Sequence, residues 1–228
     1  KVLQNIIAET QPSIGSILNE IDSCSVFSAV GISGPHQIFI PNQHDLSEIA
    51  PQHIENSQLS YPLVAKLVSS DLPHKTEHGA IILNIANSAE LTLAVTKMLD
   101  AAKASVPNAN IDGVLIQEVV SKLGEALIGL RRDNLVGPVV TVGAGGFLAE
   151  IYKDVSHRLA PVSLKTARQM IAEITGFESM RGYRNHPVGD LEALAKAIMA
   201  ISQLGQYDQI AEAEVNPILI CKDRVVMV

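Results

Sequence analysis

Apolar and polar residues follow two distinct periods along the chain after residue 60. Dense or alternating apolar runs predict strands, and apolar residues spaced three or four positions apart predict helices. The predicted strands are 61–68, 80–85, 113–119, 125–130, 137–142, 210–220 and 224–228. The predicted helices are about 88–104, which Ser88 would cap, 163–174 and 190–204. Helices and strands mix without strict βαβ alternation, which indicates an α+β (α/β) fold.

The first 60 residues have a less regular pattern than the rest of the chain. Glycines and prolines break any long element there; they are Pro12, Gly15, Gly31, Gly34, Pro35, Pro41 and Pro51. The pattern still predicts one helix, from about Ser16 to Val30, because Gly31 supplies the residue that commonly ends a helix.

The composition is that of a globular protein. Of the 228 residues, 47% are hydrophobic and 18% are charged, which excludes a disordered chain, a collagen and a coiled coil. The 17 Lys and Arg against 24 Asp and Glu give a net charge of −7, which is unfavourable for coating nucleic acid. The apolar stretch around 80–95 contains Asn84, Asn87 and Glu90 and is too short to span a bilayer. We therefore expect neither nucleic acid nor membrane as a partner.

Two cysteines, Cys24 and Cys221, are present without a CxxC motif or a His/Cys ligand spacing. This pattern argues against zinc, an iron–sulfur cluster or a disulfide scaffold, and it favours two reduced thiols in a cytoplasmic protein. The chain begins at Lys1 and shows no signal peptide, so we expect it to be a piece of a longer protein.

Lys66 stands in the middle of the apolar run 61–68. An ammonium group in such a place is costly to desolvate unless a carboxylate or a phosphate lies beside it. Two interpretations remain open: a phosphate-binding lysine that projects into a cleft, and a surface lysine on a strand with two different faces.

Two glycine-containing segments could approach an anion. The loop 71–79 combines two histidines, a lysine and a threonine before Gly79, as in loops that close over phosphates, although a solvated turn has the same composition. The cluster Gly143–Gly146 follows a predicted strand, so its backbone N–H groups could contact an anion, or it could form a tight turn. It matches neither a Walker loop nor a dinucleotide fingerprint. Further on, Asp154 and Arg158 are four apart, a spacing that suits one helix face or one loop.

Acidic and amide side chains alternate near the C-terminus. Glu212, Glu214 and Asn216 would share one side of an extended strand, and oxygen ligands of this kind suit Mg²⁺ together with substrate phosphates. A solvated acidic face is the alternative interpretation. The seven histidines are scattered, and none of them forms a recognisable nucleophile triad.

Together these residues resemble the ATP-grasp domain of ADP-forming acyl-CoA synthetases, namely acetate–CoA ligase (ADP-forming) and its beta subunit, distant relatives of succinyl-CoA ligase. The resemblance covers about three quarters of the chain. It rests on Tyr61-Pro-Leu-Val-Ala-Lys66, His74-Lys-Thr-Glu-His-Gly79, Val114-Leu-Ile-Gln-Glu118, Gly124-Glu-Ala-Leu-Ile-Gly129, Arg132-Asp133, Gly137-Pro-Val-Val140, Gly143-Ala-Gly-Gly146, Lys153-Asp-Val-Ser156, Arg158-Leu-Ala-Pro161, Gly182-Tyr-Arg184 and Glu214-Val-Asn-Pro217.

The resemblance implies two subdomains that grip ATP or ADP with Mg²⁺. It implies an N-terminal segment 1–60 that completes the first lobe, a subdomain 61–120, and a second subdomain 121–228 whose end is truncated. It assigns catalysis to Lys66 and His74, the latter as a phosphoryl acceptor. The implied nucleotide-binding residues are Lys66, Lys75, Thr76, Gly79, Gln117, Glu118, Val120, Glu125, Gly145, Gly146 and Arg158, and the implied metal ligands are Glu214 and Asn216.

Some positions depart from the family pattern. Ala80 stands where a second glycine is usual, His157 where an aromatic residue is usual, and Asn185 where a glycine is usual. The family's next metal-binding aspartate would come directly after Val228, so the magnesium site is expected to be incomplete in this chain.

The resemblance also implies partners. A CoA-binding domain and a phosphohistidine module, on the same or another chain, would complete the enzyme, a ligase that acts on a small carboxylate and CoA. The alternative is a non-catalytic nucleotide-binding module that regulates a fused acetyltransferase.

Overall fold

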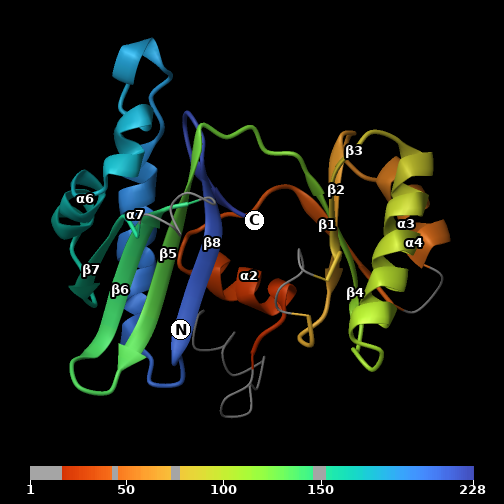
Figure 1. Ribbon diagram of the computed structural model, residues 1–228, viewed down its shortest axis with the longest axis horizontal. Coiled ribbons are helices and arrows are strands. Elements are labelled where there is room, and N and C mark those ends of the chain that lie inside the picture. The colour runs from red at the N-terminus through yellow and green to blue at the C-terminus, as the bar shows by residue number, and fades with distance from the viewer. Residues whose placement is uncertain (1–16, 43–45, 73–77, 146–152) are drawn as a thin grey trace. The chain divides into compact units, whose positions relative to one another are not determined.

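The computed structural model describes residues 17–42, 46–72, 78–145 and 153–228. The chain divides into two compact units. Unit 1 contains Cys24–Gly34 and Val120–Val228, and unit 2 contains Ser16–Ser23 and Pro35–Val119. Helix α2 (Glu20–Ala29) begins in unit 2 and ends in unit 1. Each unit has one antiparallel sheet (Figure 1), so the expected mixture of helices and strands is confirmed.

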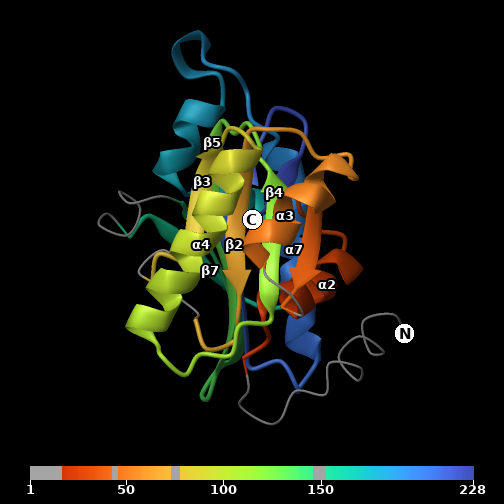
Figure 2. The ribbon, with the colours of Figure 1, turned by 90° about the vertical axis from the view of Figure 1, so that its right-hand side faces the viewer.

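Unit 2 is a four-stranded sheet with helices on one face. Its elements are β1 (Gln37–Pro41), α3 (Leu46–Glu55), β2 (Leu63–Val68), β3 (Ile81–Ile85), α4 (Ser88–Ser105) and β4 (Gly113–Glu118). The strands lie in the order β1-β4-β2-β3, and α3 and α4 cover the sheet (Figure 2). Leu63, Ala65 and Leu67 belong to the core beneath these helices. Because side chains alternate along a strand, Lys66 belongs to the other face.

Helix α3 and strand β1 were not expected from the sequence pattern. Leu46, Ala50 and Ile54 recur every four residues in α3 and are all buried, so burial of one apolar stripe stabilises the helix. Pro51 lies inside this helix, where it removes a hydrogen bond and costs about 3 kcal/mol. Tertiary packing therefore outweighs the cost of Pro51, which was expected from the sequence to break any long element.

The residue that caps helix α4 lies one position before the predicted cap. The Oδ1 atom of Asn87 accepts a hydrogen bond from the backbone N–H of Glu90 at 3.0 Å. The carboxylate of Glu90 accepts in return from the backbone N–H of Ala86 at 2.8 Å. Glu90 thus reaches back to the residue before the cap, in a variant of the capping box, and Asn87 rather than Ser88 caps the helix.

Unit 1 is a five-stranded sheet, also with helices on one face. Its elements are β5 (Gly124–Asp133), β6 (Gly137–Ala144), β7 (Val155–Leu159), α6 (Leu164–Ala172), η1 (Thr175–Met180), η2 (Tyr183–Asn185), α7 (Leu191–Gln203), η3 (Leu204–Gln206), β8 (Glu212–Ile220) and β9 (Val225–Met227). The strands lie in the order β7-β6-β5-β8-β9. Strand β7 was not predicted, and it places Arg158 on a strand rather than on the helix or loop suggested by its spacing from Asp154.

Arg132 closes the end of this sheet. Its guanidinium donates to the carbonyl oxygens of Ile210, Gly205 and Tyr207 at 3.2, 2.8 and 2.9 Å. Replacing Arg132 with alanine leaves these carbonyls without their donor and should lower the free energy of unfolding by about 2 kcal/mol. Urea denaturation checks this value. The exposed neighbour Arg131 provides the control, because Arg131→Ala should change stability by less than about 0.5 kcal/mol.

Candidate functional site

Most of the described site residues that the sequence predicted fall on strands, and the register of these strands shows which face each side chain occupies. We call the face of each sheet that is turned away from that unit's own helices (α3 and α4, or α6 and α7) the far face. In unit 2, Lys66 pairs with Leu115, and Val64 pairs with Gln117 on the neighbouring strand. Directly opposed residues of an antiparallel pair share a face. The structure therefore brings Lys66 and Gln117 together on the far face of unit 2.

Lys66 is paired with a carboxylate. Its Nζ atom lies 2.9 Å from Oε1 of Glu20, and the two side chains are 7% and 16% exposed. The sequence argument required an anion beside this ammonium, and Glu20 supplies it. Glu20 was not among the predicted site residues. The sequence did contain one indication of its role. Glu20 is an acidic residue near the start of a predicted helix, and the buried Lys66 needs a negatively charged partner.

Gln117 and Glu118, two further residues of the predicted nucleotide set, lie on different faces of the sheet. Gln117 is 2% exposed and donates to the side-chain oxygen of Gln37 at 2.6 Å. Glu118 pairs with Leu63 and so points to the helix-covered face, where its carboxylate accepts from the backbone N–H of His36 at 3.2 Å. Only Gln117 presents its side chain beside Lys66.

The glycine loop is described only at its end. His74, Lys75 and Thr76 lie outside the described residues, as does Gly146. Gly79 has a φ of +63°, a left-handed conformation that favours glycine, and a Cβ there would lie 3.2 Å from that of Ala101. Gly79 thus turns the chain into β3.

The far face of unit 1 carries a row of residues across four strands. Glu214 pairs with Gly129, Gly129 with Thr141, and Thr141 with His157. Neighbouring strands are about 4.8 Å apart, so Thr141 stands roughly 10 Å from Glu214 across the bare backbone of Gly129. The His157 ring contacts Thr141, with Nδ1 and Oγ1 2.8 Å apart.

Strand β8 bulges beside Glu214. The register slips between the Ala126 and Ile128 positions of β5, so Asn216 and Pro217 together face a single residue of the neighbouring strand. Glu214 and Asn216 are both exposed. Bulges are common next to binding sites, where they alter the direction of nearby side chains.

These oxygen donors suit a magnesium ion that arrives with a ligand. A Cβ built on Gly129 would lie 3.9 Å from Oε2 of Glu214, so the glycine keeps the space beside the carboxylate clear. Among the described residues, no group of three His, Cys, Asp or Glu is placed to hold a metal ion. Mg²⁺ commonly takes one or two protein oxygens and completes its shell with phosphates and waters. Glu214 and Asn216 fit that requirement.

Glu125, Gly145 and Val120 lie near the start of β5. Glu125 is ion-paired with Lys122. The N–H of Gly145 donates to the carbonyl of Glu125 at 2.7 Å, and a Cβ on Gly145 would come within 2.6 Å of the Cβ of Glu125. The chain directly after β6 therefore runs so close to β5 that position 145 has no room for a side chain. Val120 packs against a small apolar cluster that contains Leu219.

Arg158 is not brought to the far face. It pairs with the buried Val140 and forms an ion pair with Glu173 at the end of α6. The hydroxyl of Ser156 donates to the other oxygen of Glu173 at 2.5 Å. Arg158 and Glu214 therefore occupy opposite faces of one sheet.

The contacts of Glu173 predict a pH effect on stability. The Ser156 hydroxyl and then the Arg158 guanidinium hold the pKa of this carboxyl below its usual range. A depressed pKa contributes stability that is fully present above the unfolded-state pKa, near 4.3, and is lost as the pH falls through the folded-state value. Thermal melts from pH 7 to pH 3 should show a steeper acid loss for the wild type than for Glu173→Gln. Glu48→Gln on the exposed face of α3 should follow the wild-type curve; parallel curves for all three would contradict the assignment.

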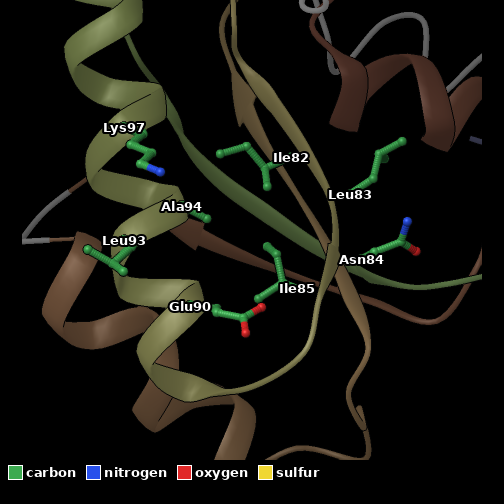
Figure 3. A pocket seen from close by; sticks show the side chains of 8 residues that line it. All are labelled: Ile82, Leu83, Asn84, Ile85, Glu90, Leu93, Ala94 and Lys97. Atoms are coloured by element: carbon green, nitrogen blue, oxygen red, sulfur yellow. The ribbon is translucent and has the colours of Figure 1, made fainter.

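A surface hollow of unit 2 lies apart from these residues. It is formed by the edge strand β3 and helix α4 (Figure 3), and its lining residues are Ile82, Leu83, Asn84, Ile85, Glu90, Leu93, Ala94 and Lys97. Ile82 pairs with Ala65 of the helix-covered core, whereas Ile81 pairs with Lys66. The hollow thus belongs to the helix side of the sheet.

None of the described helices combines the length and apolar composition needed to cross a membrane. The described part of the chain thus consists of two antiparallel sheets, each with helices on one face and polar side chains on the other. A family model described as ATP-grasp domain matches residues 10–228. The chain therefore belongs to the ATP-grasp family, as its motifs suggested, and the expected fold class is confirmed.

Within this family the chain matches the beta subunits of ADP-forming acetate–CoA ligases. It is 29% identical over 229 residues to subunit beta of Acetate–CoA ligase (ADP-forming) I from Pyrococcus furiosus. The alignment covers 100% of this chain and 94% of that protein. It is 30% identical over 218 residues to Acetate–CoA ligase (ADP-forming) I from Archaeoglobus fulgidus, covering 95% of this chain. The chain spans only 31% of that longer relative.

A solved structure gives the same result. The dinucleotide forming acetyl-coenzyme A synthetase 1 of Ca. Korarchaeum cryptofilum, in complex with coenzyme A, Ca-AMPCP and HgCl+, superposes with a TM-score of 0.84 at 30% identity. The match covers 92% of this chain and 90% of that one.

Proposed function

We propose that this chain is the nucleotide-binding part of an ADP-forming acyl-CoA synthetase. The observation that carries the proposal is the placement of two exposed oxygen donors on β8 of unit 1: Glu214 lies opposite the bare Gly129 of β5, and Asn216 lies at the bulge next to it. Among the relatives, subunit beta of the Pyrococcus furiosus ligase has nearly the length of this chain, which supports a unit that works with a separate partner.

The proposed residue roles differ between the two units. Lys66 of unit 2 neutralises phosphate charge and orients the phosphate chain, while Gln117 and the segment to Val120 lie beside the base. Glu214 and Asn216 of unit 1 would hold Mg²⁺, which would offset the charge of the triphosphate. Catalysis then depends on positioning and charge neutralisation, as in phosphoryl transfer generally. We leave Arg158 out of this set because it faces the helices.

The reaction is a phosphoryl relay. A histidine nitrogen attacks the γ-phosphorus of ATP, the bond to ADP breaks, and ADP leaves. The phosphoryl group passes to a carboxylate to form an acyl phosphate, and the thiol of CoA then displaces phosphate to give the acyl-CoA. His74 is a candidate acceptor because an imidazole is a nucleophile near neutral pH. The CoA-binding domain and the phosphohistidine module lie on another part of the protein or on a partner.

We also place the protein in the cytoplasm. Both cysteines belong to the described part of the chain, and neither forms a disulfide. Reduced thiols are the usual state in that compartment.

The test uses the full-length gene product together with any separate CoA-binding subunit. Mg-ATP at 100 times its dissociation constant should stabilise the fold by about 2.7 kcal/mol in thermal denaturation. Repeated turnover, measured as ADP released beyond one equivalent per protein, should then require both CoA and a short carboxylate. Binding of ATP without ADP release for any carboxylate would support the regulatory module, and no binding would contradict the proposal.

A further inference from the structure

The ion pair between Lys66 and Glu20 is more than a surface contact. Both side chains are largely buried, and Nζ and Oε1 are 2.9 Å apart. A buried ammonium without a counter-charge costs several kcal/mol. Lysine also has a large rotamer entropy in solution, which must be lost before the group can hold a phosphate in one place. A fixed carboxylate removes both obstacles before any nucleotide arrives.

Hydrogen bonds hold Glu20 in place. Asn19 caps the first turn of α2, with its Oδ1 accepting from the backbone N–H of Asp22 at 3.0 Å. The amide of the same Asn19 donates to Asp112 at 3.3 Å, and the N–H of Asp112 donates to the carbonyl of Val68 at 2.8 Å. The start of α2 is thus tied to the sheet that carries Lys66.

We propose that Glu20 is a positioning residue, whose carboxylate holds the Lys66 ammonium extended on the far face of unit 2 for the phosphates of the nucleotide. This inference rests on the proposed function. An ammonium has three N–H donors, and one carboxylate oxygen accepts only one of them, so Lys66 can bind Glu20 and a phosphate oxygen together. Glu20 acts through Lys66 and contacts no substrate.

The test compares ligands that differ only in phosphate. Calorimetry on the full-length protein measures binding of Mg-ATP and of adenosine to wild type and Glu20→Gln, which keeps the shape and removes the charge. We expect about tenfold weaker ATP binding and unchanged adenosine binding. Glu20→Asp should recover part of the lost affinity. Glu48→Gln, an exposed carboxylate on α3, is the matched control and should bind both ligands normally.

A double-mutant cycle tests whether Glu20 acts through Lys66. In a Lys66→Met background, Glu20→Gln should cause no further loss of ATP affinity, since there is no ammonium left to position. Equal losses for ATP and adenosine in Glu20→Gln, or full ATP affinity, would overturn the inference. If Glu20→Gln does not fold, the Glu20→Asp variant and the double variant decide the matter. Failure of wild type to bind ATP would instead remove the proposed function itself.

Discussion

Replacing Lys66 with methionine should weaken ATP binding by about 100-fold. A charge-assisted hydrogen bond to a phosphate contributes about 1.5–3 kcal/mol, and methionine keeps the apolar stem while it removes the charge. Calorimetry with Mg-ATP and adenosine checks this result, because adenosine binding should change little. The exposed Lys97 of α4 provides the control, and Lys97→Met should bind ATP as the wild type does.

The same Lys66 substitution should also destabilise the fold. It leaves the mostly buried Glu20 carboxylate without its cation, and breaking a buried pair from one side costs about 3 kcal/mol or more. Adding Glu20→Gln should restore most of that loss in urea denaturation without restoring ATP binding. Unchanged ATP affinity in a folded Lys66→Met variant would remove Lys66 from the site.

Replacing Glu214 with glutamine should reduce ADP release by about 100-fold or more. The side chain is exposed on the far face of unit 1, so the fold should tolerate the change. A neutral amide is a weaker Mg²⁺ ligand than a carboxylate, and the stabilisation that Mg-ATP gives in thermal denaturation should fall with it. The measurement is a titration of Mg²⁺ at fixed ATP, in which the variant should require a higher Mg²⁺ concentration.

Glu212 provides a matched control for that titration. It is an exposed carboxylate two residues earlier on β8, opposite Arg131 rather than Gly129. Glu212→Gln should retain ADP release within about threefold of the wild type. Equal losses for the two variants would indicate a general effect of surface charge rather than a ligand role for Glu214.

The long elements could be predicted because burial imposes one clear period on them. The helix expected at 190–204 is α7 (Leu191–Gln203), and Asp190 caps it as such residues do. Helix α3 could not be predicted, since its apolar stripe is broken by Pro51 and only tertiary packing compensates. Strand β7 is short and lies at a sheet edge, so its pattern is weak.

The need for an anion beside Lys66 follows from elementary electrostatics, but its identity does not. Glu20 lies 46 positions upstream, and nothing local to Lys66 points to it. The sequence also did not show which face of the sheet Arg158 occupies. Its four-residue spacing from Asp154 suits a helix, whereas in the strand the side chain points toward α6. The carboxylate row at Glu212 and Glu214 was predictable since period two needs only an extended strand.

The counter-ion of Lys66 comes from a stretch of chain that is separated from the rest of unit 2 by residues of unit 1. A fragment that begins at Pro35, made to isolate the smaller unit, would therefore lack Asn19 and Glu20. Such a fragment would carry an uncompensated amine within its sheet. Transplanting this lobe into another enzyme thus requires the opening turn of α2 to travel with it, although it is remote in the primary structure.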